Sequence, residues 1–190
     1  CAAVKAFEAP WPAERELKTF NVALEGDAAV DGEAAIYSRA VGSRDGKKPA
    51  TPGDSIFSVG TKVLTLEYRF GKGWKFVRVV PAAGLEEIPG KPSALSVWVN
   101  GDGHGNSLRC RFRDARGETF QPTAGAVGWG DWKRVSIPLE GRDAKSWGGG
   151  EDGRVDYPIA WDSIFLLDST REACMGHIEL ASPVLVYPPE

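Results

Sequence analysis

Residues 107–114 alternate between apolar and arginine side chains, and this alternation constrains the fold more than any other feature of the sequence. The apolar positions are Leu108, Cys110 and Phe112, and the positions between and after them are Arg109, Arg111 and Arg113. Successive side chains of an extended strand point to opposite faces, so a period of two predicts a strand with one buried and one open face. We therefore expect a row of guanidinium groups on the outside of a β-sheet.

A second segment rich in strand formers, residues 95–100, lies just before this strand. The glycine-rich residues 101–106 separate the two segments, and glycine supplies the positive φ angles that a tight connection needs. We expect the two segments to pair as an antiparallel hairpin. Residues 132–139 repeat the alternation with Arg134 on the polar side, so Arg134 joins the row if this strand lies in the same sheet.

A further hairpin is predicted nearer the N-terminus. Residues 62–70 alternate in the same way, with the side that carries Leu64 facing the core. The Gly-Lys-Gly sequence at 71–73 is typical of a tight turn, and residues 74–80 form the second strand.

The composition favours an all-β chain. With 23 glycines and 13 prolines in 190 residues, many short strands joined by turns are expected, and no long stretch has the spacing of an amphipathic helix. About ten strands without helices require a sandwich or a barrel, and the long connections favour a jelly-roll β-sandwich of two antiparallel sheets. A chain of this length fits a single domain over residues 1–190.

The charge of the chain argues against several partners. A formal net charge of -3 differs from the basic excess of proteins that bind nucleic acids or anionic membranes. No apolar run approaches the roughly 20 residues of a membrane-spanning helix. We therefore expect no nucleic-acid partner and no membrane span.

The three cysteines, Cys1, Cys110 and Cys174, lack the spacing of a metal site, and the chain has only 2 histidines. A buried free thiol is the favoured reading of Cys110, because it lies on the apolar side of its strand. A Cys110–Cys174 disulfide is the alternative in a secreted protein. Cys1 is either the lipid-modified first residue of a mature bacterial lipoprotein or simply the point at which the sequence was cut. We expect a secreted or cell-surface protein.

An ordered set of motifs resembles galactose-binding-domain-like jelly rolls, which occur as carbohydrate-binding modules of polysaccharide-degrading enzymes. The motifs lie at residues 95–106, 108–114, 117–121, 129–135 and 176–180. The resemblance covers about half of the chain. It implies a non-catalytic module that binds a polysaccharide or oligosaccharide and that belongs to a longer chain with other domains.

Modules of this kind often hold a structural calcium ion, and here the resemblance is incomplete. The place of an Asp-Asp pair on the last strand is taken by Ala181 and Ser182. Glu8, Asp27 and Glu179 could still supply oxygen ligands, of which Ca²⁺ takes six to eight. No other cofactor is expected, and the identity of any metal ligand stays open.

Glycan recognition needs flat apolar rings and planar polar groups. The candidate ligand-binding residues are Trp98, Arg109, Arg111, Arg113, Gln121, Arg134 and Trp147. Arginine pairs in a bidentate manner with carboxylate or sulfate, so the row suggests an acidic glycan such as a uronate or sulfated polysaccharide. The alternative is a solvated sheet face whose arginines pair across strands with Asp114, Glu118 or Glu67.

Two other classes of function stay open. A polysaccharide-cleaving glycoside hydrolase would need a carboxylate pair, drawn from Glu67, Glu118, Asp131, Asp162 and Asp168. A lyase would need a base near an arginine, for which Tyr68 is the candidate. A Ser-His-Asp triad is disfavoured, because no Gly-x-Ser-x-Gly motif is present. A protein-interaction domain would instead use the tryptophans and arginines as a binding hot spot.

Overall fold

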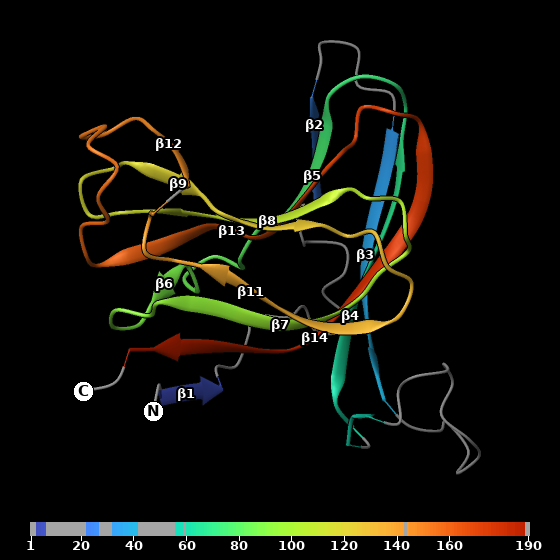
Figure 1. The fold of residues 1–190 in the computed structure, drawn as a ribbon, viewed down its shortest axis with the longest axis horizontal. Coiled ribbons are helices and arrows are strands. Elements are labelled where there is room, and N and C mark those ends of the chain that lie inside the picture. Colours follow the sequence, from blue (N-terminus) through green and yellow to red (C-terminus); the bar gives the residue numbers. More distant parts are fainter. Residues whose placement is uncertain are drawn as a thin grey trace.

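The computed structural model describes residues 3–6, 22–26, 32–41, 56–58, 60–142 and 144–188. These residues form two antiparallel sheets and contain no α-helix (Figure 1). Sheet A has the order β11 (Trp132–Pro138), β7 (Ala94–Asn100), β14 (Cys174–Tyr187), β4 (Lys62–Phe70) and β3 (Gly32–Ala40), and β1 (Ala3–Ala6) pairs with the end of β14. Sheet B has the order β12 (Lys145–Trp147), β9 (Thr119–Gln121), β8 (Ser107–Arg113), β13 (Ile159–Asp168), β5 (Lys75–Val79) and β2 (Val22–Gly26). Two short strands complete sheet B, since β10 (Thr123–Ala126) pairs with β8 and β6 (Glu87–Ile88) pairs with β13.

The strand order is that of a jelly roll. The chain alternates between the sheets as it passes through β4, β5, β7 and β8, and it alternates again through β11, β13 and β14. The inner strands of sheet A are β7, β14 and β4, and those of sheet B are β9, β8, β13 and β5. Two interleaved antiparallel sheets with this alternation confirm the predicted jelly-roll β-sandwich.

The core lies between the sheets and is built from one side of each strand. Leu108, Cys110 and Phe112 are fully buried, as the alternation in β8 predicted. The Phe112 and Phe120 rings stack with their centroids 5.2 Å apart. Burial of such side chains contributes about 1.5–3 kcal/mol each, so the sorting of apolar and arginine positions stabilises the orientation of β8.

The predicted hairpin between residues 95–100 and 107–114 is wrong. β7 pairs with β11 and β14 in sheet A, whereas β8 pairs with β9, β10 and β13 in sheet B. The six residues 101–106 are long enough to cross the gap of about 10 Å between packed sheets. The glycines therefore serve a crossing between layers and not a turn within one sheet.

The second predicted hairpin is wrong for the same reason. β4 lies in sheet A and β5 lies in sheet B, so residues 71–74 also cross between the layers. The assignment of the inner face is confirmed, because Leu64, Leu66, Tyr68 and Phe70 are all buried. The sequence also predicts a strand over residues 16–24, of which only residues 22–24 lie within the described residues, where they form part of β2.

Cys110 and Cys174 are free thiols, so the favoured reading of Cys110 is confirmed and the alternative disulfide is wrong. Burial raises the pKa of the Cys110 thiol well above its ordinary value. Cys1 lies outside the described residues. Among the residues that are described, no helix has the length and hydrophobicity to cross a bilayer.

Candidate functional site

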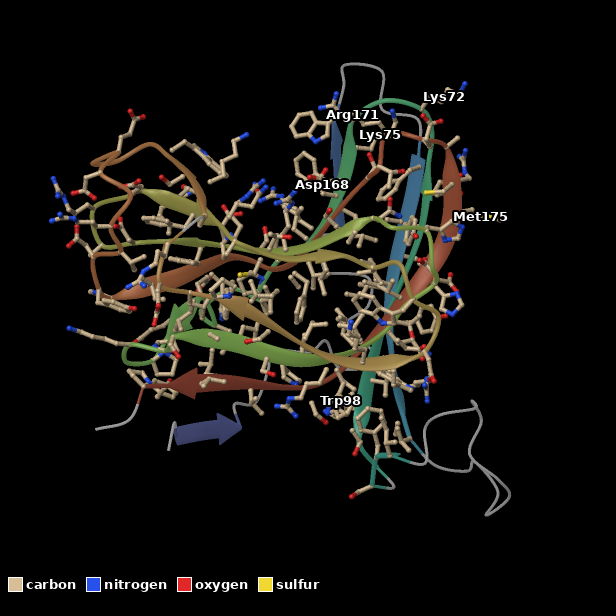
Figure 2. All side chains as sticks on the ribbon, in the orientation of Figure 1. Lys72, Lys75, Trp98, Asp168, Arg171 and Met175 are labelled. Atoms are coloured by element: carbon tan, nitrogen blue, oxygen red, sulfur yellow. The ribbon has the colours of Figure 1, made fainter. Side chains whose placement is uncertain are left out.

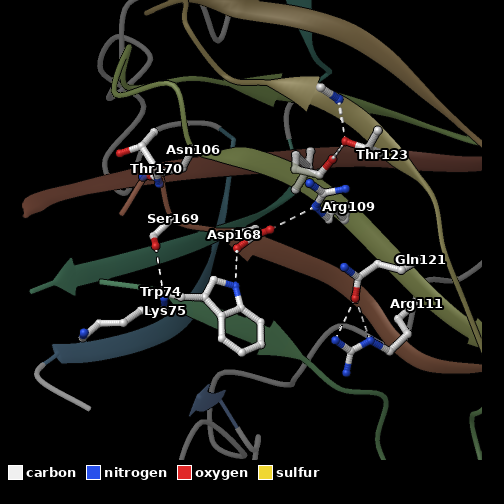
Figure 3. Close-up of polar contacts among 12 residues, drawn as sticks. Trp74, Lys75, Asn106, Arg109, Arg111, Gln121, Thr123, Asp168, Ser169 and Thr170 are labelled. Atoms are coloured by element: carbon white, nitrogen blue, oxygen red, sulfur yellow. Dashed lines mark hydrogen bonds and ion pairs between the residues drawn. The ribbon is translucent and has the colours of Figure 1, made fainter. Parts of the chain in front are cut away.

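The arginines of β8 alternate with buried residues and so project from the outer face of sheet B. Figure 3 shows Arg109 beside Asp168 and Arg111 beside Gln121. The side chain of Arg111 is 15% exposed and that of Arg113 is 58% exposed. Neighbouring strands add further side chains to the same face, which we call the arginine face. Its described members are Trp74, Phe76, Arg78, Arg109, Arg111, Arg113, Gln121, Trp147, Asp162 and Asp168.

Arg111 is held at the centre of this face. Its Nε and Nη2 atoms both donate to Gln121 Oε1, at 2.9 and 2.7 Å. Its guanidinium carbon lies 5.2 Å from the ring centroid of Trp147 and 5.5 Å from that of Phe76. The predicted association of Arg111, Gln121 and Trp147 is therefore present. A cation fixed in this way meets a ligand with little further loss of side-chain entropy.

Trp74 occupies one end of the face. It is 43% exposed, and its Nε1 donates to Asp168 Oδ1 at 3.2 Å. Asp168 also lies 3.3 Å from Arg109 Nε, and the ring of Phe76 lies 5.1 Å from that of Trp74. Trp74 thus presents a large aromatic surface to solvent while its polar edge is held by a carboxylate.

Sequence reasoning missed Trp74 and Phe76 as members of this face. Trp74, Phe76 and Arg78 occupy every second position, but the pattern in the sequence is weak, because the intervening Lys75 is charged and Phe76 is itself buried.

Asp162 links the arginines at the other end of the face. Its carboxylate lies 3.0 Å from Arg78, 3.6 Å from Arg111 and 3.5 Å from Arg113. The arginines therefore pair with acids of β13, and not with Asp114, Glu118 or Glu67. Of the described side chains on the face, four are guanidinium groups and two are carboxylates, so the face carries an excess of positive charge.

A hollow of about 390 Å³ opens beside Arg113. Its lining consists of Val80, Pro81, Glu86, Arg113, Ala160, Trp161 and Asp162. Because Arg113 and Asp162 belong to both, the hollow is continuous with the arginine face.

Trp147 lies on β12, at the start of a loop that buried carboxylates hold in place. Trp147 is 38% exposed and pairs with Thr119 of β9. Glu118, which is buried, accepts hydrogen bonds from the backbone N–H groups of Asp152 and Gly153, each at 3.1 Å. Gly149 has a φ of 56°, and a side chain there would collide with the backbone of residues 117 and 118. The residues that follow Trp147 are therefore fixed against the β8–β9 turn.

Trp98 and Arg134 lie on the other sheet. Both project from the outer face of sheet A, where the Arg134 guanidinium lies 5.9 Å from the Trp98 ring and its Nε donates to Ser96 Oγ at 2.9 Å. The expectation that Arg134 joins the row is wrong, because β11 pairs with β7 and not with β8. Trp98 contacts Phe57, and Figure 2 shows it far from Asp168 of the arginine face.

Tyr68 is buried on the core side of β4 and does not lie beside the arginine row. Its hydroxyl donates to Asp102 Oδ2 at 2.5 Å and accepts from Asn106 Nδ2 at 2.8 Å. Burial and then the bond to Asp102 raise the pKa of Tyr68 far above its ordinary value, which is the reverse of what a catalytic base requires. The proposed role of Tyr68 as a lyase base therefore loses its geometric support.

The described residues include no group of three His, Cys, Asp or Glu side chains arranged to hold a metal ion. Glu8 and Asp27, two of the three suggested calcium ligands, lie outside the described residues. Glu179 is engaged with Arg39 Nε at 2.8 Å and with Asn100 Nδ2 at 3.0 Å. Its carboxylate is thus balanced by protein donors.

Fold and site together define a jelly-roll sandwich with an aromatic and arginine-rich open sheet face. No family model matches the chain, and no curated protein is similar to it. Among solved structures, the chain is similar to the family 11 carbohydrate-binding module of the cellulosomal cellulase Lic26A-Cel5E of Clostridium thermocellum. The TM-score is 0.48 and the identity is 11%, over 90% of this chain and 98% of the other.

Proposed function

We propose that this chain is a non-catalytic module that binds a polysaccharide on the arginine face. The observation that carries the proposal is the joint exposure of Trp74 and Trp147 on the same face as a fixed set of arginine, glutamine and aspartate side chains. Aromatic rings stack on the apolar faces of pyranose units, and the polar groups between them bond to hydroxyls.

The charge of the face favours an acidic polysaccharide, such as a uronate or sulfated chain. Four guanidinium groups oppose two carboxylates among the described side chains there, although the whole chain has a net charge of -3. Arginine binds carboxylate and sulfate in a bidentate manner. A local excess of positive charge also steers an anionic polymer towards this face. We further propose that the module is secreted or displayed on the cell surface, within a larger polysaccharide-degrading protein.

Affinity electrophoresis in gels that contain polygalacturonate, a sulfated glycan or a neutral glucan tests this function. We expect retardation by an acidic polymer and no product after long incubation with it. Trp74→Ala and Trp147→Ala should each weaken binding about tenfold, because each removes one stacking ring.

Trp98→Ala is the matched control, since Trp98 is a partly exposed tryptophan on the opposite sheet. It should leave retardation unchanged. Absence of retardation by every polymer, or an equal loss in all three tryptophan variants, contradicts the proposal. Release of product would indicate an enzyme instead.

A further inference from the structure

The hollow beside Arg113 exists because β5 is shorter than its neighbour β13. β5 ends at Val79, and the chain returns to the edge of β13 only at β6, where Ile88 pairs with Ile159. The return is fixed by a hydrogen bond of 2.6 Å from Trp161 N to Glu86 O. Val80, Pro81 and Glu86 therefore form a side wall, and residues 160–162 of β13 form part of the lining.

The lining of the hollow differs in charge from the rest of the arginine face. Val80, Pro81 and Ala160 provide apolar surface. Glu86 adds a carboxylate to the lining, and Asp162 is already paired with Arg78, Arg111 and Arg113, so the hollow has no excess of positive charge. An acidic group therefore gains less attraction there than on the rest of the arginine face, whereas a carboxylate acceptor and a guanidinium donor are suited to sugar hydroxyls.

The size of the hollow limits what it can hold. A volume of about 390 Å³ lies near the lower end of the range for small-molecule pockets, which is roughly 300–1,000 Å³. This volume suits one sugar unit better than a segment of polymer.

We propose that the hollow is a subsite for one neutral sugar unit of a polysaccharide whose acidic main chain lies on the arginine face. The unit is either a side branch or a chain end, since both present the same ring and hydroxyls. This inference rests on the proposed function and adds to it a requirement for a neutral unit.

Two variants test the subsite by different means. Glu86→Ala removes an acceptor and keeps the backbone carbonyl that bonds to Trp161. Ala160→Phe fills the hollow from its floor. Glu87→Ala is the matched control, because Glu87 is the next residue, is exposed, and does not line the hollow. Thermal unfolding of each variant checks the fold, and Glu86→Ala carries the test if Ala160→Phe does not fold.

The ligands are an acidic pectin with neutral side branches, the same pectin after enzymatic debranching, and acidic oligosaccharides with or without a neutral terminal sugar. Calorimetry should show a loss of at least fivefold in affinity for ligands that carry the neutral unit, and no loss for the matching ligands that lack it. A loss confined to branched pectin assigns the hollow to a branch, and a loss confined to the capped oligosaccharides assigns it to a chain end.

Equal affinities of Glu86→Ala and the unsubstituted protein for every ligand would contradict the subsite. They would not contradict polysaccharide binding on the arginine face. A loss in Glu87→Ala as large as in Glu86→Ala would also contradict the subsite. If the unsubstituted protein binds none of these ligands, the subsite fails, and the proposed function fails with it if no polymer retards the protein in affinity electrophoresis.

Discussion

Arg111 and Arg113 lie two positions apart on the same strand, yet their surroundings give them different tasks. Arg111 is enclosed by Trp147, Phe76 and Gln121, so its side chain is part of the structure of the face. Arg113 is mostly exposed, and its 3.5 Å ion pair with Asp162 is long. Exposed pairs of this kind contribute little to stability, so Arg113 is available to a ligand at small cost.

We expect Arg113→Ala to lower the affinity for an acidic polysaccharide several-fold at low salt and to leave the melting temperature within error. Arg111→Ala should lower the affinity and also destabilise the fold by about 1–2 kcal/mol, since it removes a packed side chain. Calorimetry at two salt concentrations and denaturant unfolding measure both effects. Identical stability losses in the two variants would contradict this division of roles.

Tyr37 contributes to the stability of the folded state in a way that depends on pH. Burial, together with its 2.7 Å hydrogen bond to Glu67, raises the pKa of Tyr37 to about 12. A raised pKa means that this contribution is complete below the unfolded value near 10 and is lost as the pH rises through 12. The stability difference between the unsubstituted protein and Tyr37→Phe should therefore shrink between pH 10 and 12. A difference that stays constant in denaturant unfolding across this range argues against the linkage.

At the scale of elements, alternation within one strand predicted which side of that strand is buried. It predicted the arginine row and the core side of β4, because those depend only on neighbours along the chain. It could not predict which sheet holds a strand, since paired strands and strands that face each other across a sandwich bury their apolar sides equally well. Trp98 and Arg134 were misplaced for this reason.

The acids of the site could not be found by the same reasoning. Asp162 and Asp168 reach the arginines because β13 lies between β8 and β5 in sheet B. Residues 114–158 separate β13 from β8, residues 80–158 separate it from β5, and no local pattern specifies the order of these strands.

The loop after β12 should depend on the carboxylate of Glu118 for its conformation. Glu118→Ala leaves the N–H groups of Asp152 and Gly153 without their acceptors, which should cost about 1–3 kcal/mol. Polysaccharide binding should weaken as well, because Trp147 adjoins this loop. Glu118→Gln retains one acceptor oxygen and should recover part of both losses. Unchanged retardation of Glu118→Ala in affinity electrophoresis would show that the position of Trp147 does not depend on this loop.

For the whole molecule, both sheets share one core, so a cavity on the inner side of β8 affects them together. Phe112→Ala should lower the free energy of unfolding by about 3–5 kcal/mol, because Phe112 is fully buried against Phe120. Denaturant unfolding followed by tryptophan fluorescence and circular dichroism measures this loss. A loss below about 1 kcal/mol would indicate that the side chain is not part of a close-packed core.

The free thiols give a second prediction for the whole molecule. The melting temperature should not change with a reductant, because Cys110 and Cys174 are not bridged. In a Cys1→Ser variant, a thiol reagent should label Cys174 in the folded state and Cys110 only after unfolding, since Cys110 is fully buried. A reductant-sensitive melting temperature in that variant would contradict the assignment.

The last two strands, β13 and β14, are inner strands of their sheets. β14 lies between β7 and β4, and β13 lies between β8 and β5, so each sheet has a gap at its centre until the C-terminal part of the chain is made. Loop closure over such distances is slow, and incomplete sheets expose strand edges. During synthesis, therefore, neither sheet can form completely until β13 and β14 have left the ribosome.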